Sequence, residues 1–232
     1  MKVGIMQPYF LPYIGYFQLI AAVDLFILYD NIKYTKKGWI NRNRMLQNGK
    51  DIMFSLPLKS ASDYLDVRER ELSNDFRRDK LLSQIKGAYR RAPYFAQTFA
   101  LVERVVLHEE TNLFDFLHHS IAETCAHLGI ITKIRPSSNV AIDHDLKGQD
   151  KVLALCSSVG GSTYINPIGG ITLYSKKTFH ENDIDLKFIQ SESFNYAQFS
   201  GEFIPWLSIV DVLMFQPVSE VVTRIHNGFY LL

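Results

Sequence analysis

The first thirty residues constrain the fold of this chain more than any other segment. Two short apolar runs, KVGIM at residues 2–6 and LFILY at 25–29, are separated by a helix-like stretch at 15–23. Continuous apolar runs of this length are typical of strands buried on both faces, as in parallel sheets. A strand, a helix and a second strand in this order are the repeating unit of such sheets. The chain is therefore predicted to begin as β–α–β within a mostly parallel sheet.

The next segment predicts a β-hairpin followed by helices. Residues 39–46 and 51–57 flank Asn48-Gly49, a strong signal for a two-residue hairpin turn, and 64–72 are a candidate for a further strand. Three helices are then predicted from their start signals: a cap at Asn74 or Asp75, the proline at position 93, and a cap at Thr111 or Asn112, with the block ending at Gly129.

Strands and helices alternate again after residue 129. Strands are predicted at 130–135, 162–165 and 185–190, and helices at 149–159, 178–182 and 207–215. This order predicts an α/β fold with a mostly parallel sheet. We expect one domain over residues 1–232, with a helical lobe at about 74–128.

Composition excludes several classes of protein. No apolar run reaches the roughly 18 residues needed to span a bilayer, and the start of the chain lacks the pattern of a signal peptide. Cys125 and Cys156 lie in apolar helical stretches without the spacing of a zinc site, so both are expected to be buried and reduced. We therefore expect a cytoplasmic protein with no metal, no cofactor and no membrane span.

The charges are divided unevenly between the two parts of the chain. Residues 1–91 hold 16 Lys and Arg against 9 Asp and Glu, whereas residues 92–232 hold 9 against 15. The basic part suggests an anionic partner, although two parts that neutralise each other would show the same numbers. The formal net charge of +1 argues against duplex nucleic acid. An anionic small molecule is the expected ligand.

The turn QPYFLPYIG at residues 7–15 is the first candidate binding element. Its two prolines fix φ and stiffen the backbone, and Gly15 permits a close approach where the helix begins. Gln7 offers an amide at a strand end, and Tyr9 and Tyr13 offer aromatic rings. The N-terminus of the helix offers backbone N–H groups to an anion. The alternative is a rigid strand-to-helix crossover with buried aromatic side chains.

A basic loop follows the second strand. Six cations and no acid occur from Lys33 to Lys50. If residues 39–44 form a strand, alternation places two amides on one face and two guanidinium groups on the other, and paired guanidinium groups suit phosphate or carboxylate. The amides are Asn41 and Asn43, the guanidinium groups are Arg42 and Arg44, and Lys36 and Trp39 are nearby. A solvated charged face is the alternative.

Asp30 ends the second predicted strand and opens the basic loop. A carboxylate at a strand end beside cations is the best candidate here for a general base, or for a group that orients an amine. The alternative is a structural role, in which Asp30 caps a helix or a loop.

Two weaker signals lie in the C-terminal part. The segment STYINPIGG at 162–170 combines a short strand with flanking glycines, which suggests that backbone closely approaches a ligand or another loop. Asp211 follows Ser208 by three residues in an apolar helix, and a buried carboxylate needs a partner. An arginine of the basic loop is the expected partner, and a surface-facing Asp211 is the alternative.

Familiar catalytic motifs are missing from the sequence. No Ser/His/Asp set, HExxH motif or Walker-type phosphate loop is recognisable. The strand–turn–helix start superficially resembles that of nucleotidylyl transferases, but neither of the histidines that those enzymes carry is present in Tyr13-Ile14-Gly15-Tyr16. This likeness is one of fold only.

Taken together, these residues resemble the WbqC-like family over almost the whole chain. The matching residues are Gln7-Pro8-Tyr9-Phe10-Leu11-Pro12-Tyr13-Ile14-Gly15-Tyr16-Phe17, Asp30, Lys36, Trp39, Asn41-Arg42-Asn43-Arg44, Pro57, Tyr89, Ala92-Pro93, Ser137-Ser138, Tyr164 and Leu207-Ser208-Ile209-Val210-Asp211.

The resemblance implies a role in bacterial surface-polysaccharide assembly, O-antigen in particular. It suggests transfer of a glycyl, other aminoacyl or other acyl group to the amine of a nucleotide-linked amino sugar. In that reaction Arg42, Arg44 and Lys36 would hold the diphosphate and Asp30 would orient or deprotonate the amine. Tyr9 and Trp39 would pack on the sugar or base. The acyl donor stays open among an aminoacyl-tRNA, a carrier thioester and an adenylate.

Two other functions stay open from the sequence. One is a nucleotidyl-transferring or adenylate-forming enzyme, and the missing histidines count against it. The other is a non-catalytic binding protein of the polysaccharide machinery. For either function, and for acyl transfer, the sequence leaves the acceptor sugar and the oligomeric state open.

Overall fold

A computed structural model describes residues 1–199 and 201–232. Its centre is a six-stranded sheet in the order β5-β2-β1-β6-β7-β8. The first five strands run parallel, and β8 runs antiparallel to β7 at one edge. The strands are β1 Lys2–Met6, β2 Leu25–Leu28, β5 Lys133–Pro136, β6 Thr163–Pro167, β7 Asp185–Ser191 and β8 Phe229–Leu231. The predicted α/β class and parallel β–α–β start are confirmed.

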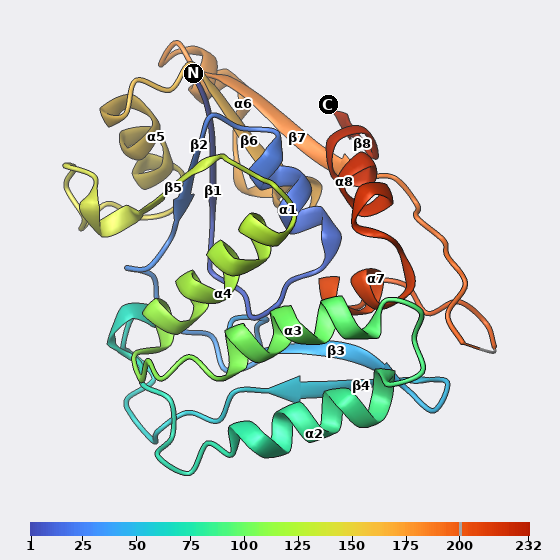
Figure 1. Ribbon diagram of the computed structural model, residues 1–232. Helices are drawn as coiled ribbons and strands as arrows, with labels where there is room; N and C mark the ends of the chain where they lie inside the picture. The colour runs from blue at the N-terminus through green and yellow to red at the C-terminus, as the bar shows by residue number, and fades with distance from the viewer. Residues whose placement is uncertain (200) are drawn as a thin grey trace.

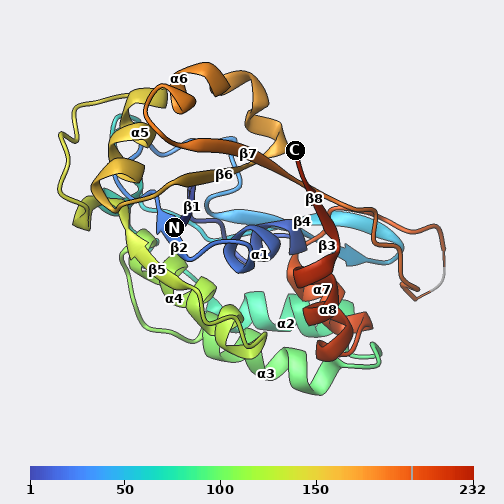
Figure 2. The same cartoon turned by 90° about the horizontal axis from the view of Figure 1, so that it is seen from above.

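Successive side chains of the strands point to opposite faces of the sheet, and an apolar core lies on each face. Val3 and Ile5 of β1 face one core, to which α5 (Gly148–Ser158) and α6 (Lys176–His180) contribute Leu155 and Phe179. The other core takes Phe26 of β2, with α1 (Ile14–Ala21), α4 (Leu113–His127) and α8 (Val218–Asn227). Figure 2 shows these two helical layers on opposite sides of the sheet.

The predicted hairpin is present and lies apart from the main sheet. It consists of β3 (Arg42–Gln47) and β4 (Lys50–Ser55), joined by Asn48 at φ +51° and Gly49 at φ +73°. Positive φ at both turn residues is what an Asn-Gly hairpin turn requires. In Figure 1 the hairpin crosses beneath the lower ends of β1 and β2, and α2 (Arg78–Tyr89) lies below it.

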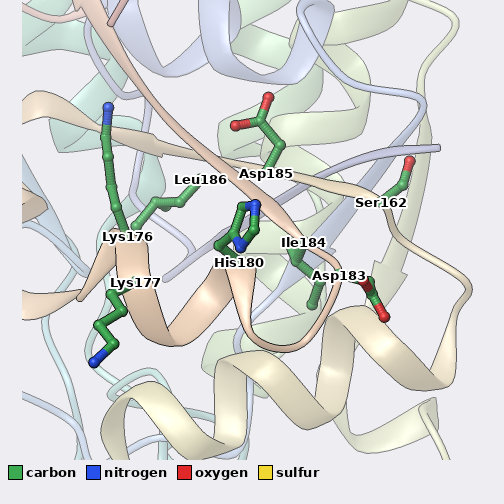
Figure 3. Close-up of a pocket in the computed structure, with 8 residues that line it drawn as sticks. All are labelled: Ser162, Lys176, Lys177, His180, Asp183, Ile184, Asp185 and Leu186. Atoms are coloured by element: carbon green, nitrogen blue, oxygen red, sulfur yellow. The ribbon is translucent and has the colours of Figure 1, made fainter.

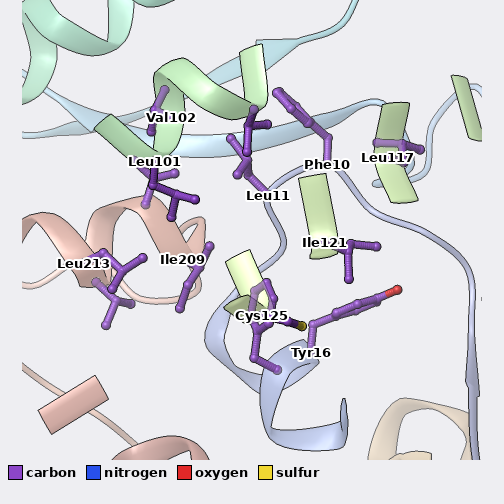
Figure 4. Packing of buried hydrophobic residues seen from close by; sticks show 14 of the residues in the cluster. Phe10, Leu11, Tyr16, Leu101, Val102, Leu117, Ile121, Cys125, Ile209 and Leu213 are labelled. Carbon is purple, nitrogen blue, oxygen red and sulfur yellow. The ribbon is translucent and has the colours of Figure 1, made fainter. Parts of the chain in front are cut away.

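The turn after β1 is buried between the main sheet and the helical segment of the molecule. Phe10 and Leu11 are fully buried, and they lie among side chains of α3 (Phe95–Val106), α4 and α7 (Ile209–Phe215), as Figure 4 shows. Burying a Phe or Leu side chain contributes about 1.5–3 kcal/mol. The turn is therefore a structural joint between the sheet and the helical segment.

Several sequence predictions need correction. Residues 64–72 form no strand, because Asp66 and Glu69 make a reciprocal capping box that starts the short 3-10 helix η1 (Val67–Glu69). The first helix of the predicted helical lobe, α2, starts at Arg78 rather than at Asn74 or Asp75. Asn112 does cap α4, accepting hydrogen bonds from the backbone N–H groups of Phe114 and Asp115.

The last fifteen residues contain two elements that the predictions lacked. Helix α8 follows Pro217, and Val221 and Ile225 bury one face of it. Strand β8 then pairs with β7. The apolar spacing after a proline was a usable signal for α8. Within the described residues no helix is long and apolar enough to cross a membrane.

The strand order creates one point where the chain reverses direction across the sheet. From β1 the chain first builds outward through β2 to β5, then returns to the other side of β1 for β6 and β7. The connection after β1 and the connection after β6 therefore run in opposite directions across the sheet. Their divergence leaves a crevice at the carboxyl ends of strands β1 and β6. Open parallel sheets bind their ligands at such a switch point.

Candidate functional site

A hollow of about 340 Å³ lies at this switch point. The carboxyl ends of β1, β2 and β6 all contribute to it, and we call it the strand-end hollow. Its walls are Ile5, Met6, Gln7, Tyr9, Tyr29, Ile32, Asn166, Pro167, Gly169, Gly170, Leu173 and Tyr174. A volume in this range is at the small end of sites that hold an organic ligand.

The β6 side of the strand-end hollow is closely fitted around Asn166. Its Oδ1 accepts a hydrogen bond of 2.9 Å from the Tyr164 hydroxyl, and its Nδ2 donates to the Pro167 carbonyl at 3.0 Å. A Cβ on Gly170 would lie 2.0 Å from Asn166 Nδ2. Gly170 is therefore needed for this arrangement, which gives the weak glycine signal at 162–170 a physical basis.

The turn between β1 and α1 is held rigidly. Leu11 has a φ of +43°, which is unfavourable for a residue with a side chain. Asn43 Nδ2 donates to the carbonyls of Phe10 and Leu11, and the Ser208 hydroxyl donates to Leu11 at 2.7 Å. The N–H of Ile209 donates to the Pro12 carbonyl at 2.8 Å. These bonds fix the turn that carries Tyr9 and Tyr13.

Strand β3 begins at Arg42, so alternation separates Asn43 from Arg42 and Arg44 as predicted, whereas Asn41 precedes the strand. Both amides bond to protein. Asn43 is buried and secures the turn, while Arg42 and Arg44 are partly exposed on the other face. Asn41 accepts a hydrogen bond of 2.8 Å from the Tyr34 hydroxyl and donates to the Leu56 carbonyl.

Two of the predicted phosphate-binding cations also have partners within the protein. Arg42 donates to the carbonyls of Lys37 and Gly38, so it closes its own loop. Lys36 pairs with Asp63 at 2.7 Å, with both side chains more than half exposed. Such exposed pairs are weak, so Lys36 can exchange partners at little cost. Neither residue is in the wall of the strand-end hollow.

Arg44 lies in the wall of a second hollow, of about 180 Å³. We call it the tryptophan hollow, and its walls are Tyr9, Pro12, Tyr13, Trp39, Asn43, Arg44 and Trp206. Tyr9 belongs to both hollows, so they adjoin. The structure thus brings together Gln7, Tyr9, Tyr13, Trp39, Asn43 and Arg44 along two neighbouring hollows.

Asp30 lines neither hollow. The residue is 2% exposed, and Oδ1 of its carboxylate accepts hydrogen bonds from the Ser137 hydroxyl at 2.7 Å and the Ser138 N–H at 2.9 Å. Burial raises the pKa of Asp30, but hydrogen bonds from Ser138 and Ser137 outweigh it and leave the pKa below its usual value. The carboxylate is therefore ionised at neutral pH and ties β2 to the segment after β5.

Polar groups that sequence reasoning missed surround Asp30. Asn31 contacts the Ser137 hydroxyl and His144 Nδ1, and the buried Lys151 donates to the His144 carbonyl at 3.1 Å. Burial is the main cause that lowers the pKa of Lys151. Its ammonium lies 5.3 Å from the centre of the Tyr29 ring, which lines the strand-end hollow. Nothing in local sequence spacing connects these distant residues.

Asp211 is fully buried, and its partners differ from both sequence expectations. Its carboxylate accepts hydrogen bonds from the hydroxyls of Tyr89 at 2.7 Å and Tyr196 at 2.6 Å, and from Gln198 Nε2 at 2.8 Å. The expected arginine partner was wrong, and so was the surface-facing alternative. Burial outweighs these hydrogen bonds and raises the pKa of Asp211. Asp211 therefore ties α7 to α2 and to the loop before Trp206.

Further hollows lie elsewhere on the described surface. One of about 320 Å³ shares Tyr13 and Trp206 with the tryptophan hollow, and its other walls include Ser191, Phe194 and Tyr196. Another, of about 630 Å³, lies at the other end of the strands, near the amino ends of β6 and β7. Figure 3 shows its walls, which include Lys176, His180 and Asp185. It lies far from the switch point, so we do not assign it to the candidate site.

Tyrosine side chains supply hydrogen-bonding groups in the candidate site. Burial raises the pKa of both Tyr9 and Tyr29 to about 12, so both phenols stay protonated at neutral pH. Asn166, Tyr174 and Trp206 complete the walls, and only Asn166 had a sequence signal. Among the described residues, no group of three or more His, Cys, Asp or Glu side chains is placed to hold a metal ion.

Comparison with known proteins identifies the family of this chain. A model described as the WbqC-like protein family matches residues 7–223. The uncharacterized protein Rv1507c of Mycobacterium tuberculosis (strain ATCC 25618 / H37Rv) is 29% identical over 217 residues, which cover 91% of this chain and 92% of that protein. No solved structure matches the chain significantly. The family match spans every residue that lines the tryptophan hollow and, except for Ile5 and Met6, every residue that lines the strand-end hollow.

Proposed function

Because this chain belongs to the WbqC-like protein family, we propose that it is a transferase that acylates the amine of a nucleotide-linked amino sugar. The amino sugar binds in the strand-end hollow. The reaction serves the assembly of a bacterial surface polysaccharide, and the acyl group is glycyl, another aminoacyl or a related group.

The observation that supports this proposal most is the position of the strand-end hollow. It opens at the carboxyl ends of β1 and β6, where the connections diverge, and such switch points hold the ligands of open parallel sheets. Gln7 and two protonated tyrosines line it, and these neutral groups suit the hydroxyls of a sugar. Gly169 and Gly170 let a ligand approach the backbone.

The chemistry requires positioning above all. The amine nitrogen attacks the carbonyl carbon of an activated acyl donor, a C–N bond forms, and the bond from that carbon to the leaving group breaks. The amine loses one proton in the same process. Holding an amine against an activated carbonyl can supply about 7–11 kcal/mol of the barrier reduction. A rigid turn with Tyr9 and Gln7 on one side and the Asn166 network on the other is suited to this task.

Arg44 is the group in these walls that suits a diphosphate. It lines the tryptophan hollow together with Tyr9, which belongs to both hollows, and its guanidinium carries a permanent charge. Lys36 and Arg42 remain proposed contributors, and each would have to leave its present partner to reach the phosphates. Asp30 would have to leave Ser137 and Ser138 to act as the base.

A second function, as a non-catalytic binding protein, is favoured by one observation. Among the described residues, no His, Cys, Asp, Glu or Lys lines the strand-end or tryptophan hollow. Such walls can hold a ligand, but they offer no side chain that exchanges protons near neutral pH. The absence of a histidine there gives no support to nucleotidyl transfer.

The test is an assay for a covalent product. Purified protein is mixed with a panel of nucleotide-linked amino sugars and with charged tRNA, acyl-carrier thioesters, or an amino acid and ATP with its activating enzyme. Mass spectrometry should detect the sugar nucleotide with one acyl group in place of one hydrogen of its amine. Gln7→Ala should lower the yield at least tenfold, whereas Gln47→Ala, in the hairpin away from both hollows, should leave it unchanged.

Three outcomes decide between the two functions. A product that needs Gln7 supports the transferase. Tight binding of the nucleotide sugar without product for any donor supports the binding protein. Failure of the whole panel to bind or react contradicts both.

A further inference from the structure

Both tryptophans of the chain line the same small hollow. The sequence contains two, Trp39 and Trp206, which are far apart along the chain. Both lie in the wall of the tryptophan hollow, and both keep a large exposed area, 42% and 60%. Large aromatic side chains usually bury most of their surface. Two exposed indoles on one concave surface therefore indicate a ligand with a complementary flat face.

The backbone at Trp206 is strained in a way that favours the same interpretation. Its φ is +61°, and a bulky side chain at such an angle is a genuine outlier. Backbone strain of this kind persists only where the surroundings enforce it, and it gathers at functional sites. Here the Trp206 carbonyl accepts a hydrogen bond of 3.2 Å from Arg44 Nη2, and its ring meets Tyr13 edge to face at 5.8 Å.

Arg44 connects the two tryptophans. Its guanidinium carbon lies 5.8 Å from the Trp39 ring, and Nη1 pairs with Asp51 at 2.9 Å. Its Nε is buried and has no hydrogen-bond partner among the described residues. A buried donor without a partner is costly, so the Arg44 side chain is held in this position by its bonds to Asp51 and to the Trp206 carbonyl.

We infer that the tryptophan hollow binds the nucleobase of a nucleotide, with the base ring packed against Trp39 and Trp206. This inference rests on the proposed function in one respect, namely that the substrate is nucleotide-linked. A base has two flat π-faces, and stacking on aromatic side chains is a strong and general way to hold it.

A nucleobase fits this hollow better than a sugar ring does. A sugar carries a hydroxyl on most of its carbons and needs many polar partners, but Asn43 uses its side chain to hold the turn. Beside Arg44 the wall then offers the rings of Tyr9, Tyr13 and the two tryptophans, which present mostly flat aromatic surface. The hollow, at about 180 Å³, is also smaller than the roughly 300–1,000 Å³ of pockets that hold whole drug-sized ligands. It therefore takes one ring system and leaves the rest of the ligand outside.

The rest of the ligand has a place in the adjoining hollow. Tyr9 is the shared wall, so a nucleotide sugar with its base beside Trp39 passes Tyr9 and Arg44 with its diphosphate and enters the strand-end hollow with its sugar. This arrangement uses both hollows for one extended ligand. It also places the only cation of either wall next to the phosphates.

Tryptophan fluorescence gives a direct test, since both fluorophores are in the proposed site. The probes are the diphosphates of uridine, thymidine, cytidine, adenosine and guanosine, and ribose 5-phosphate as a probe without a base. We expect at least one nucleoside diphosphate to quench the emission saturably and ribose 5-phosphate to bind at least tenfold more weakly. Trp39→Phe and Trp206→Phe keep a ring and should each retain binding, with quenching of the remaining tryptophan.

Variants without a ring give the second arm, read by calorimetry. Trp39→Leu should weaken nucleotide binding at least tenfold. Trp206→Gly removes both the ring and the left-handed strain, so we expect weaker binding together with an unchanged or higher melting temperature. Tyr64→Leu, at an exposed ring away from both hollows, should bind as the native protein does. Loss of binding with an unchanged melting temperature separates a site from a folding defect.

The inference and the proposed function fail in different ways. Nucleotide binding that needs Trp39, with no acylated product, supports the base site and contradicts the transferase. An acylated product whose KM is unchanged in Trp39→Leu supports the transferase and overturns the base site. Equal binding of ribose 5-phosphate and the nucleoside diphosphates also overturns the base site.

Discussion

Asp30 and Asp211 are both buried carboxylates, and their pKa values are shifted in opposite directions. Asp30 has a backbone N–H and a serine hydroxyl as donors to Oδ1, and its pKa is lowered despite burial. Asp211 has two phenols and an amide as donors, and burial still raises its pKa. Neither makes an ion pair among the described residues.

The difference lies in depth and in the kind of donor. Asp211 is 0% exposed and Asp30 is 2% exposed, but Asp30 receives a backbone amide with a fixed dipole. Each carboxylate joins segments more than a hundred residues apart. Asp30 holds β2, which carries the Tyr29 wall of the strand-end hollow, and Asp211 holds the loop that leads to Trp206. Buried carboxylates in this protein thus shape the site from behind its walls.

Removal of the Asp211 carboxylate is expected to have the largest effect. Asp211→Ala removes the acceptor of the Tyr89 and Tyr196 hydroxyls and one of the two acceptors of Gln198 Nε2, and each buried group left unpaired costs about 1–3 kcal/mol. We expect the free energy of unfolding in urea to fall by about 3 kcal/mol or more. Asp79→Ala, which breaks an exposed pair with Arg77, should leave the stability nearly unchanged. A loss as small as that of Asp79→Ala would show that Asp211 does not hold α7, α2 and the loop before Trp206 together.

Asp30→Asn is expected to have a smaller effect, because the amide oxygen can still accept from Ser137 and Ser138. We expect stability to fall by about 1–2 kcal/mol, as a charged acceptor is replaced by a neutral one. Activity per folded molecule in the acyl-transfer assay should fall less than tenfold. A loss of about 100-fold or more with unchanged stability would instead identify Asp30 as the base, as first expected from its strand-end position.

Opposite pKa shifts give opposite pH dependences. The lowered pKa of Asp30 contributes stability that is present above the unfolded value near 3.8 and is lost as pH falls through the folded value. The raised pKa of Asp211 contributes stability that is present below about 3.8 and is lost as pH rises through its folded value. One group changes stability by at most about 1.4 kcal/mol per pH unit.

Urea unfolding from pH 3 to pH 7 measures both contributions. The advantage of the native protein over Asp30→Asn should shrink as pH falls below about 4. For Asp211→Asn the trend should be the reverse: as pH rises above about 4, the free energy of unfolding of the native protein should fall relative to that of the variant. Parallel profiles for the two variants would contradict the assigned shifts.

Local sequence signals predicted much of the fold, because the interactions that fix those elements are local. Asn48-Gly49 specified its turn, Asn112 specified a helix start, and two apolar runs specified the parallel β–α–β unit. The 64–72 segment was misjudged because a capping box between Asp66 and Glu69 competes with strand pairing.

The candidate site was harder to predict, because distant segments complete it. Residue types pointed to Tyr9, Trp39 and Arg44, and the structure gathers them in one wall. The sequence could not show that Arg42 bonds to its own loop, or that Ser137 lies against Asp30 from more than a hundred residues away. Trp206 also escaped notice, since a single tryptophan in a loop has no periodicity and becomes informative only beside Trp39 and Arg44.

The smallest predicted effect concerns the wall of the strand-end hollow. It tests whether the hydrogen bonds of Asn166 hold this wall as firmly as those of Asp30 and Asp211 hold their segments. Gly170→Ala places a methyl group against Asn166 Nδ2, so the Asn166 side chain must move and lose its bonds to Tyr164 and Pro167. We expect a loss of about 1 kcal/mol in urea unfolding and weaker binding of the nucleotide sugar. Gly169→Ala is the matched control for stability, because its Cβ meets no atom within 4 Å. Equal stability of the two variants would mean that the Asn166 network is soft, and the rigid part of the site would then be the Asp211 side alone.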